Sequence, residues 1–114
     1  MEFRILSFSS FLDVNILNDN IDINVVFSNG DVFFATLITI ENIKQLMEEE
    51  SFFWIDTMLI VSSLEKNSIK KSIKEVIENG YFEKIFSKIG TLKTLEGYVK
   101  SYNDFNKVDS NFII

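Results

Sequence analysis

The sequence contains no histidine and no cysteine. Without histidine there is no Ser-His-Asp triad, no Cys-His pair and no imidazole metal ligand. Without cysteine there are no disulfides and no thiolate zinc sites, which fits a reducing cytosol. Any catalysis would have to rest on carboxylates, lysine, tyrosine or backbone dipoles, so most hydrolase chemistry is excluded.

Long apolar runs and phosphate-binding loops are also missing. The longest apolar stretch, residues 52–61, is interrupted by Asp56 and is shorter than the roughly 20 residues that span a bilayer. Glu2 stands near the start and no long apolar stretch follows, so we expect no signal peptide and a cytoplasmic location. The four glycines are scattered and form no phosphate loop.

The acids show no pattern typical of a metal or catalytic site. Asp19-Asn20-Ile21-Asp22 places two carboxylates in a turn, but lacks the glycine and the terminal glutamate of a calcium loop. Nothing selects a pair of carboxylates for glycoside chemistry. We therefore expect no metal, no cofactor and no enzymatic activity.

What is present is globular composition. Hydrophobic residues make up 46% of the 114 residues, charged residues 25%, and twelve are phenylalanine. This length allows one domain with one modest core. We expect a single domain over residues 1–114, with a loosely ordered tail from residue 103, where the chain becomes polar.

The net charge of −6 is unevenly distributed. Residues 1–65 hold two basic and eleven acidic residues, whereas residues 66–114 hold nine lysines and six acids. Acidic surfaces repel phosphate backbones and attract basic partners, so we expect neither nucleic acid nor a membrane as partner. The acids either keep the protein soluble or form an acidic binding face.

Apolar residues repeat with a period of two in several segments and predict strands. Ser9-Ser10 breaks this phase and predicts a bend. Residues 32–38 are apolar on both faces, so this strand is either central or covered by a partner. The predicted strands span residues 3–8, 11–17, 21–28, 32–38 and 52–61.

Asn29-Gly30 predicts a tight hairpin. Both residues tolerate positive φ, so a two-residue type I′ turn fits between the flanking strands. In that register Phe27 pairs with Val32, and apolar residues meet apolar ones.

Helical spacing of apolar residues follows in four segments. Thr39 is the expected N-cap of the first, and Asn79-Gly80 the expected C-cap of the second. The predicted helices cover residues 40–47, 69–78, 81–89 and 92–102. The sequence thus predicts an α+β fold: an antiparallel sheet of about four strands, in the order strand-strand-strand-helix-strand-helix-helix, with the helices packed on one face.

Asp56 lies within the apolar segment of residues 52–61, directly after Phe52-Phe53-Trp54-Ile55. A carboxylate there must be exposed or find donors, because burying it unpaired is very costly. It is either a structural link to an amide or a base, or part of a binding face on which Trp54 is ringed by acids. Such a face suits a surface rich in lysine or arginine. The candidate partner-binding residues are Asp13, Asp22, Glu48, Glu49, Glu50, Trp54 and Asp56.

The central part of the chain resembles a family. Its motifs are Asn29-Gly30-Asp31, the run Phe34–Ile43, Phe52-Phe53-Trp54 with Asp56 and Met58, and Glu78–Phe86. They resemble small acidic bacterial proteins, some of which look like immunity partners encoded beside secreted or contact-delivered toxins. The resemblance covers roughly residues 21–89 and supplies no catalytic residues.

The resemblance implies a cytoplasmic immunity protein that neutralises a cognate toxin by tight binding through an acidic surface. Such proteins often cover a basic active site and depend on fast electrostatic association. An alternative is a self-associating structural module without a toxin, in which the strand over residues 32–38 packs across a homodimer interface. A carboxylate-dependent enzyme would need a pocket with converging acids.

Overall fold

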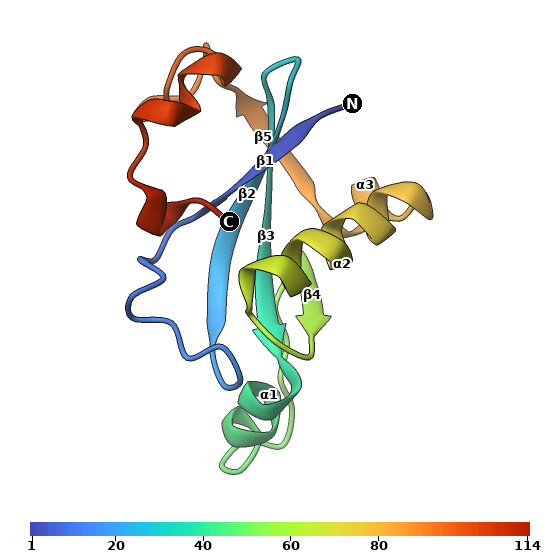
Figure 1. The fold of residues 1–114 in the computed structure, drawn as a ribbon. Helices are drawn as coiled ribbons and strands as arrows, with labels where there is room; N and C mark the ends of the chain where they lie inside the picture. Colours follow the sequence, from blue (N-terminus) through green and yellow to red (C-terminus); the bar gives the residue numbers. More distant parts are fainter.

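The computed structural model describes all residues, 1–114, and contains a five-stranded sheet with three α-helices and two short 3₁₀ helices (Figure 1). The predicted α+β class is confirmed. The elements are β1 (Phe3–Ser7), β2 (Asn20–Phe27), β3 (Asp31–Thr39), α1 (Ile40–Leu46), β4 (Met58–Val61), α2 (Lys66–Glu78), α3 (Phe82–Ile85), β5 (Ser87–Thr91), η1 (Tyr102–Lys107) and η2 (Ser110–Phe112).

The sheet is mixed, so the prediction of a purely antiparallel sheet is wrong. β1, β2 and β3 are antiparallel neighbours, but β4 runs parallel to β3 along its second half. The helix α1 and the eleven residues 47–57 carry the chain back, so that β4 enters in the direction of β3. β5 pairs antiparallel with the first half of β3, on the edge that β4 also uses.

The hairpin between β2 and β3 is present, but its predicted register is wrong by one residue. Val32 pairs with Val26 rather than with Phe27. Gly30 has a positive φ of 95°, whereas Asn29 does not, so the turn is not of type I′. The loop instead holds three residues, and the Gly30 N–H donates to the carbonyl of Phe27 at 2.8 Å.

This shift exchanges the two faces of β3. Phe33, Ala35 and Leu37 join the main core, whereas Val32 packs on the opposite face of the sheet. Both faces of β3 are therefore largely buried, which explains why its sequence is apolar throughout.

Two predicted strands are wrong or shortened. Residues 11–17 form turns, and backbone hydrogen bonds from Phe11 N–H to Asn111 and from Leu64 N–H to Ile16 fix them. Residues 52–57 are outside the sheet, and β4 begins only at Met58. Thr57 has a φ of 50°, which interrupts the extended backbone at that point.

The first two predicted helices are confirmed. Thr39 caps α1, since its hydroxyl accepts a hydrogen bond from the Asn42 N–H at 3.2 Å. α2 ends at Glu78, followed by Asn79 as C-cap and by Gly80 with a φ of 77°. This is the left-handed termination expected from the sequence.

The later helix predictions are largely wrong, and the order of elements therefore differs from the one predicted. α3 covers only Phe82–Ile85, and the chain then extends into β5. Gly90 does not end a helix but lies in β5 with a φ of 152°. Residues 92–101 form turns and bends and Tyr102 begins η1, and their apolar side chains pack on the sheet.

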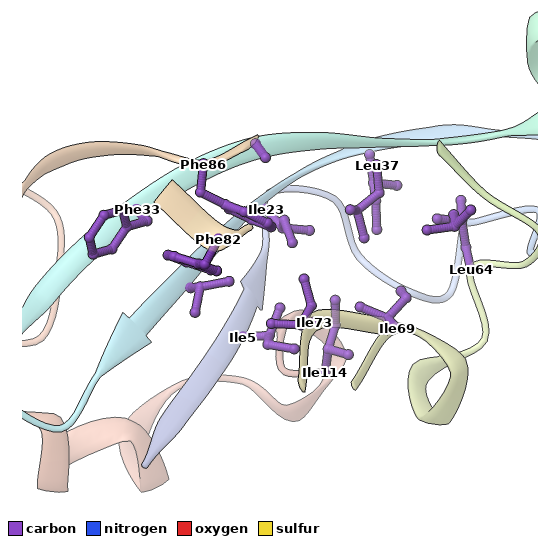
Figure 2. Packing of buried hydrophobic residues seen from close by; sticks show 14 residues of the cluster. Ile5, Ile23, Phe33, Leu37, Leu64, Ile69, Ile73, Phe82, Phe86 and Ile114 are labelled. Atoms are coloured by element: carbon purple, nitrogen blue, oxygen red, sulfur yellow. The ribbon is translucent and has the colours of Figure 1, made fainter. Parts of the chain in front are cut away.

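The main core lies between the sheet and the helices α2 and α3, which cover one face, whereas α1 lies at the end of the sheet (Figures 1 and 2). Figure 2 shows Ile5 and Ile23 of the sheet facing Ile69 and Ile73 of α2. Ile114 enters the same cluster, and its N–H donates to the carbonyl of Ile5 at 3.0 Å. The end of the chain is thus attached to the free edge of β1.

A second cluster covers part of the other face of the sheet. It consists of the buried residues Val26, Val32, Leu92 and Phe105. The segment from residue 103, predicted to be a loosely ordered tail, lies largely in η1 and η2, and its Phe105 is only 1% exposed.

Asn24 ties this second cluster to the sheet. It is 2% exposed, donates to the carbonyl of Phe33 at 3.1 Å and accepts from the Tyr98 hydroxyl at 2.7 Å. Tyr98→Phe leaves the Asn24 carbonyl oxygen without this donor, and we expect the free energy of unfolding to fall by about 1–2 kcal/mol. Urea denaturation measures this, and Tyr81→Phe, at an exposed tyrosine, should change little.

The same substitution should alter stability at alkaline pH. Burial raises the pKa of Tyr98 above its ordinary value of 10.0. The unfolded chain therefore loses this proton at lower pH than the folded chain. The stabilisation is complete below pH 10 and is lost as the pH rises through the folded pKa. Tyr98→Phe should lose less stability than the unmodified chain above pH 10, and an equal loss would contradict this role.

Candidate protein-binding surface

α1 is fixed to the end of the sheet by polar contacts. Asn42 is 9% exposed; its side chain donates to Asn18 Oδ1 at 3.1 Å and accepts from Asn20 Nδ2 at 2.8 Å. The Asp19 N–H donates to the hydroxyl of Thr39 at 3.2 Å. These contacts hold a seven-residue helix that buries little apolar surface of its own.

The apolar stripe of α1 lies largely on the surface. Ile40, Leu46 and the adjacent Met47 are 49%, 39% and 42% exposed. Helical spacing of apolar residues is usually the mark of a core face. Here the one residue of the helix that is buried is the polar Asn42.

The connection after α1 exposes two large aromatic side chains. Phe52 is 72% and Trp54 76% exposed, whereas Phe53 and Ile55 are half-buried. The alternation predicted for a strand is retained although the segment lies outside the sheet. Phe52, Trp54 and Asp56 all face solvent.

The three consecutive glutamates lie at the start of this connection. Glu48, Glu49 and Glu50 are exposed and line a hollow of about 460 Å³ together with Asn42, Gln45 and Leu46. Their carboxylates do not converge as metal ligands, since the chain contains no cluster of three acids that could hold an ion. We call α1 and residues 47–57 together the α1 end.

Asp56 and Asp22 lie on either side of Thr36. The Thr36 hydroxyl donates to Asp22 Oδ1 at 2.7 Å, and the Thr36 N–H donates to the Thr57 carbonyl at 2.9 Å. Asp56 Oδ1 accepts from the Thr57 N–H at 3.1 Å. Asp56 thus bonds to a neighbouring amide, as in the structural role considered for it, and its carboxylate remains exposed.

Asp13 does not share this arrangement. It was expected on a strand face beside Asp22, but its segment is a turn in which the Asp13 N–H donates to the Ser10 carbonyl at 3.1 Å. That segment is attached to the C-terminal residues through Phe11 and Asn111. Glu48, Glu49, Glu50, Trp54 and Asp56 therefore all lie exposed on the α1 end, Asp22 is next to it through Thr36, and Asp13 is apart.

The exposure of the apolar residues of α1 was not predicted from the sequence. The residue that could have indicated it is Asn42, which is polar, lies within the apolar stripe and is flanked in space by Asn18 and Asn20. α1 is attached to the sheet by its polar side. Ile40 and Met47 are therefore exposed, and they become part of the candidate surface.

Comparisons with protein-family models, with curated proteins and with solved structures found no match to this chain. None of its helices has the length and the apolar character that crossing a membrane would require.

Proposed function

We propose that this chain is a binding protein that neutralises a cognate bacterial toxin in the cytoplasm, with the α1 end as its contact surface. The observation that carries the proposal is Trp54, a large aromatic side chain that is 76% exposed in a segment that also holds the exposed acids Glu48, Glu49, Glu50 and Asp56. Tryptophan dominates many protein interfaces when it fills a pocket of the partner.

The apolar exposure at the α1 end supports binding. Phe52 and Trp54 leave most of their surface in water, although burying such a side chain stabilises by about 1.5–3 kcal/mol. Ile40, Leu46 and Met47, on α1 and next to it, are further exposed apolar side chains. Exposed apolar surface with a polar rim is typical of interaction sites.

The charge of the α1 end supports a basic partner. Residues 40–57 contain five acids and one lysine. The lysine, Lys44, is paired with Glu41 at 3.2 Å, which leaves the other four acids without a base. Such a surface accelerates association with a basic protein and repels a second copy of itself.

The pairing and burial of β3 argue against the alternative, which is self-association through this strand. β3 has β2 on one edge and β4 and β5 on the other. Val32 and Ile38 on its outer face are fully buried within the chain. The apolar character of this strand therefore needs no second copy to explain it.

The test is co-expression of the tagged protein with the products of its neighbouring genes, followed by mass spectrometry of what co-purifies. We expect one basic protein in a one-to-one complex that dissociates at high salt. That protein expressed alone should be toxic to cells, and co-expression of the chain should restore growth. Recovery of the chain alone as a symmetric oligomer, or rescue without complex formation, would refute the proposal.

A further inference from the structure

The largest hollow of the molecule lies at the free edge of β1, far from the α1 end. It has a volume of about 700 Å³, which is in the range of small-molecule sites. β1 pairs with the last residues of β2, next to the hairpin, whereas α1 follows the far end of β3. Figure 1 shows the N-terminus and α1 at opposite ends of the sheet.

Cationic side chains from two elements border this hollow. Arg4 comes from β1, and Lys70, Lys71 and Lys74 come from two turns of α2. Glu2 is the single acid among the lining residues. The hollow therefore has a local net charge of about +3 in a chain whose total is −6.

These cations are largely free. Of the four, only Lys74 has a carboxylate within 4.0 Å, that of Glu78. Arg4 lies over the ring of Tyr102, with its guanidinium carbon 5.6 Å from the ring centroid. This stacking orients the guanidinium without neutralising it.

The floor of the hollow is apolar. Phe3, Ile5, Ile113 and Ile114 line it, and Ile5 and Ile114 are packed into the main core (Figure 2). Burial raises the pKa of Tyr102 above its ordinary value of 10.0. Its hydroxyl is protonated at neutral pH with or without this shift and can donate a hydrogen bond. An apolar floor with charged groups at its border suits a ligand that has one apolar and one charged part.

We propose that this hollow binds a small organic phosphate. Its phosphate group would lie at the lysines of α2, with Arg4 across the edge of β1, and its apolar part would lie against the isoleucine floor. A phosphate fits better than a single carboxylate, because it carries up to two negative charges and the lining of the hollow has an excess of three positive charges. Arginine also presents a planar fork of donors that matches phosphate oxygens.

The test is NMR titration of the ¹⁵N-labelled protein with phenyl phosphate, with inorganic phosphate and phenol as separate titrants. Phenyl phosphate should shift the amide signals of Arg4, Lys70 and Tyr102 in a saturable way. Because phenol lacks the charge and inorganic phosphate lacks the ring, we expect each to bind at least about tenfold more weakly. The binding should weaken as the salt concentration rises.

The matched variants are Lys70→Gln/Lys71→Gln and the control Lys84→Gln/Lys93→Gln, which removes the same charge at exposed lysines outside both the hollow and the α1 end. The first should raise the Kd for phenyl phosphate roughly five- to tenfold, and the control should leave it unchanged. Dispersed amide spectra show that each variant is folded.

Three outcomes would overturn the proposal: no saturable shift at about 10 mM phenyl phosphate, equal weakening in the control, or shifts mapping elsewhere. Self-association of the unmodified protein that Lys70→Gln/Lys71→Gln removes, without phosphate binding, would also overturn it and assign the hollow to a second copy. These results are independent of the proposed role of the α1 end, because each pair of substitutions can be tested separately for binding of the co-purified partner.

Discussion

Replacing Phe82 by alanine should lower the free energy of unfolding by about 3–5 kcal/mol, the range for large aromatic residues truncated in a core. Phe82 is 7% exposed and is the centre of the aromatic part of the main core. Its ring is stacked on Phe86, with centroids 4.4 Å apart and an interplanar angle of 6°. It meets Phe27 and Phe33 edge-on at 5.2 and 5.0 Å. Alanine would remove all three contacts and leave a cavity between α3 and the sheet.

Urea denaturation followed by far-UV circular dichroism measures this loss. Phe52→Ala is the matched control, because the same atoms are removed from a side chain that is 72% exposed. We expect its effect to be within about 0.5 kcal/mol. If Phe82→Ala does not fold, Phe82→Leu, with an expected loss of about 1–1.5 kcal/mol, gives the measurement. Similar losses for the two alanine variants would contradict the packing described here.

The position of the hairpin between β2 and β3 was predictable from the sequence, but its register was not. Asn29-Gly30 marks the turn from local backbone preference alone, and the turn is there. Register depends on which face of each strand is apolar, and β3 is apolar on both. The pattern therefore fits a two-residue loop and a three-residue loop equally well. The choice is made by the second cluster, which buries Val26 and Val32 together on the outer face.

The C-terminal third was mispredicted because its apolar spacing has another cause. Leu92, Leu95 and Tyr102 are spaced as on a helix, but they pack against the sheet from turns and a 3₁₀ helix. Phe82 and Phe86 are four residues apart and reach the same cluster, although α3 ends between them. The periodicity of the apolar residues indicates which side chains are buried. Contacts between residues distant in sequence decide whether the backbone that carries them is a helix, a turn or a strand.

The candidate surface was predictable in part for a related reason. Alternation over residues 52–56 correctly places Phe52, Trp54 and Asp56 on one side, because an extended segment alternates with or without a sheet partner. Asp13 was grouped with them only through a predicted strand that is not formed. The exposure of Ile40 and Met47 follows from the attachment of α1 by asparagines, a tertiary contact that no local pattern contains.

The second large effect concerns the α1 end. With the basic partner recovered by co-purification, Trp54→Ala should raise the Kd about 30-fold or more, since a central tryptophan contributes about 2 kcal/mol or more to an interface. Trp54 makes few contacts within the chain, so the loss should be in the dissociation rate. The reversal Glu48→Lys/Glu49→Lys/Glu50→Lys should instead slow association about ten- to a hundredfold at low salt, and the difference should shrink as salt is added.

Both effects can be separated from damage to the fold. Leu12→Ala removes an apolar side chain that is 78% exposed and lies outside the α1 end, so it controls for Trp54→Ala. Glu75→Lys/Glu78→Lys/Glu83→Lys makes the same change in net charge at exposed acids near α2 and α3. Surface plasmon resonance at two salt concentrations measures both rates, and unchanged thermal midpoints show that the variants are folded. If the control reversal slows association as much as the reversal at the α1 end, the partner responds to total charge alone. If Trp54→Ala also leaves dissociation unchanged, the contact surface lies elsewhere on the molecule.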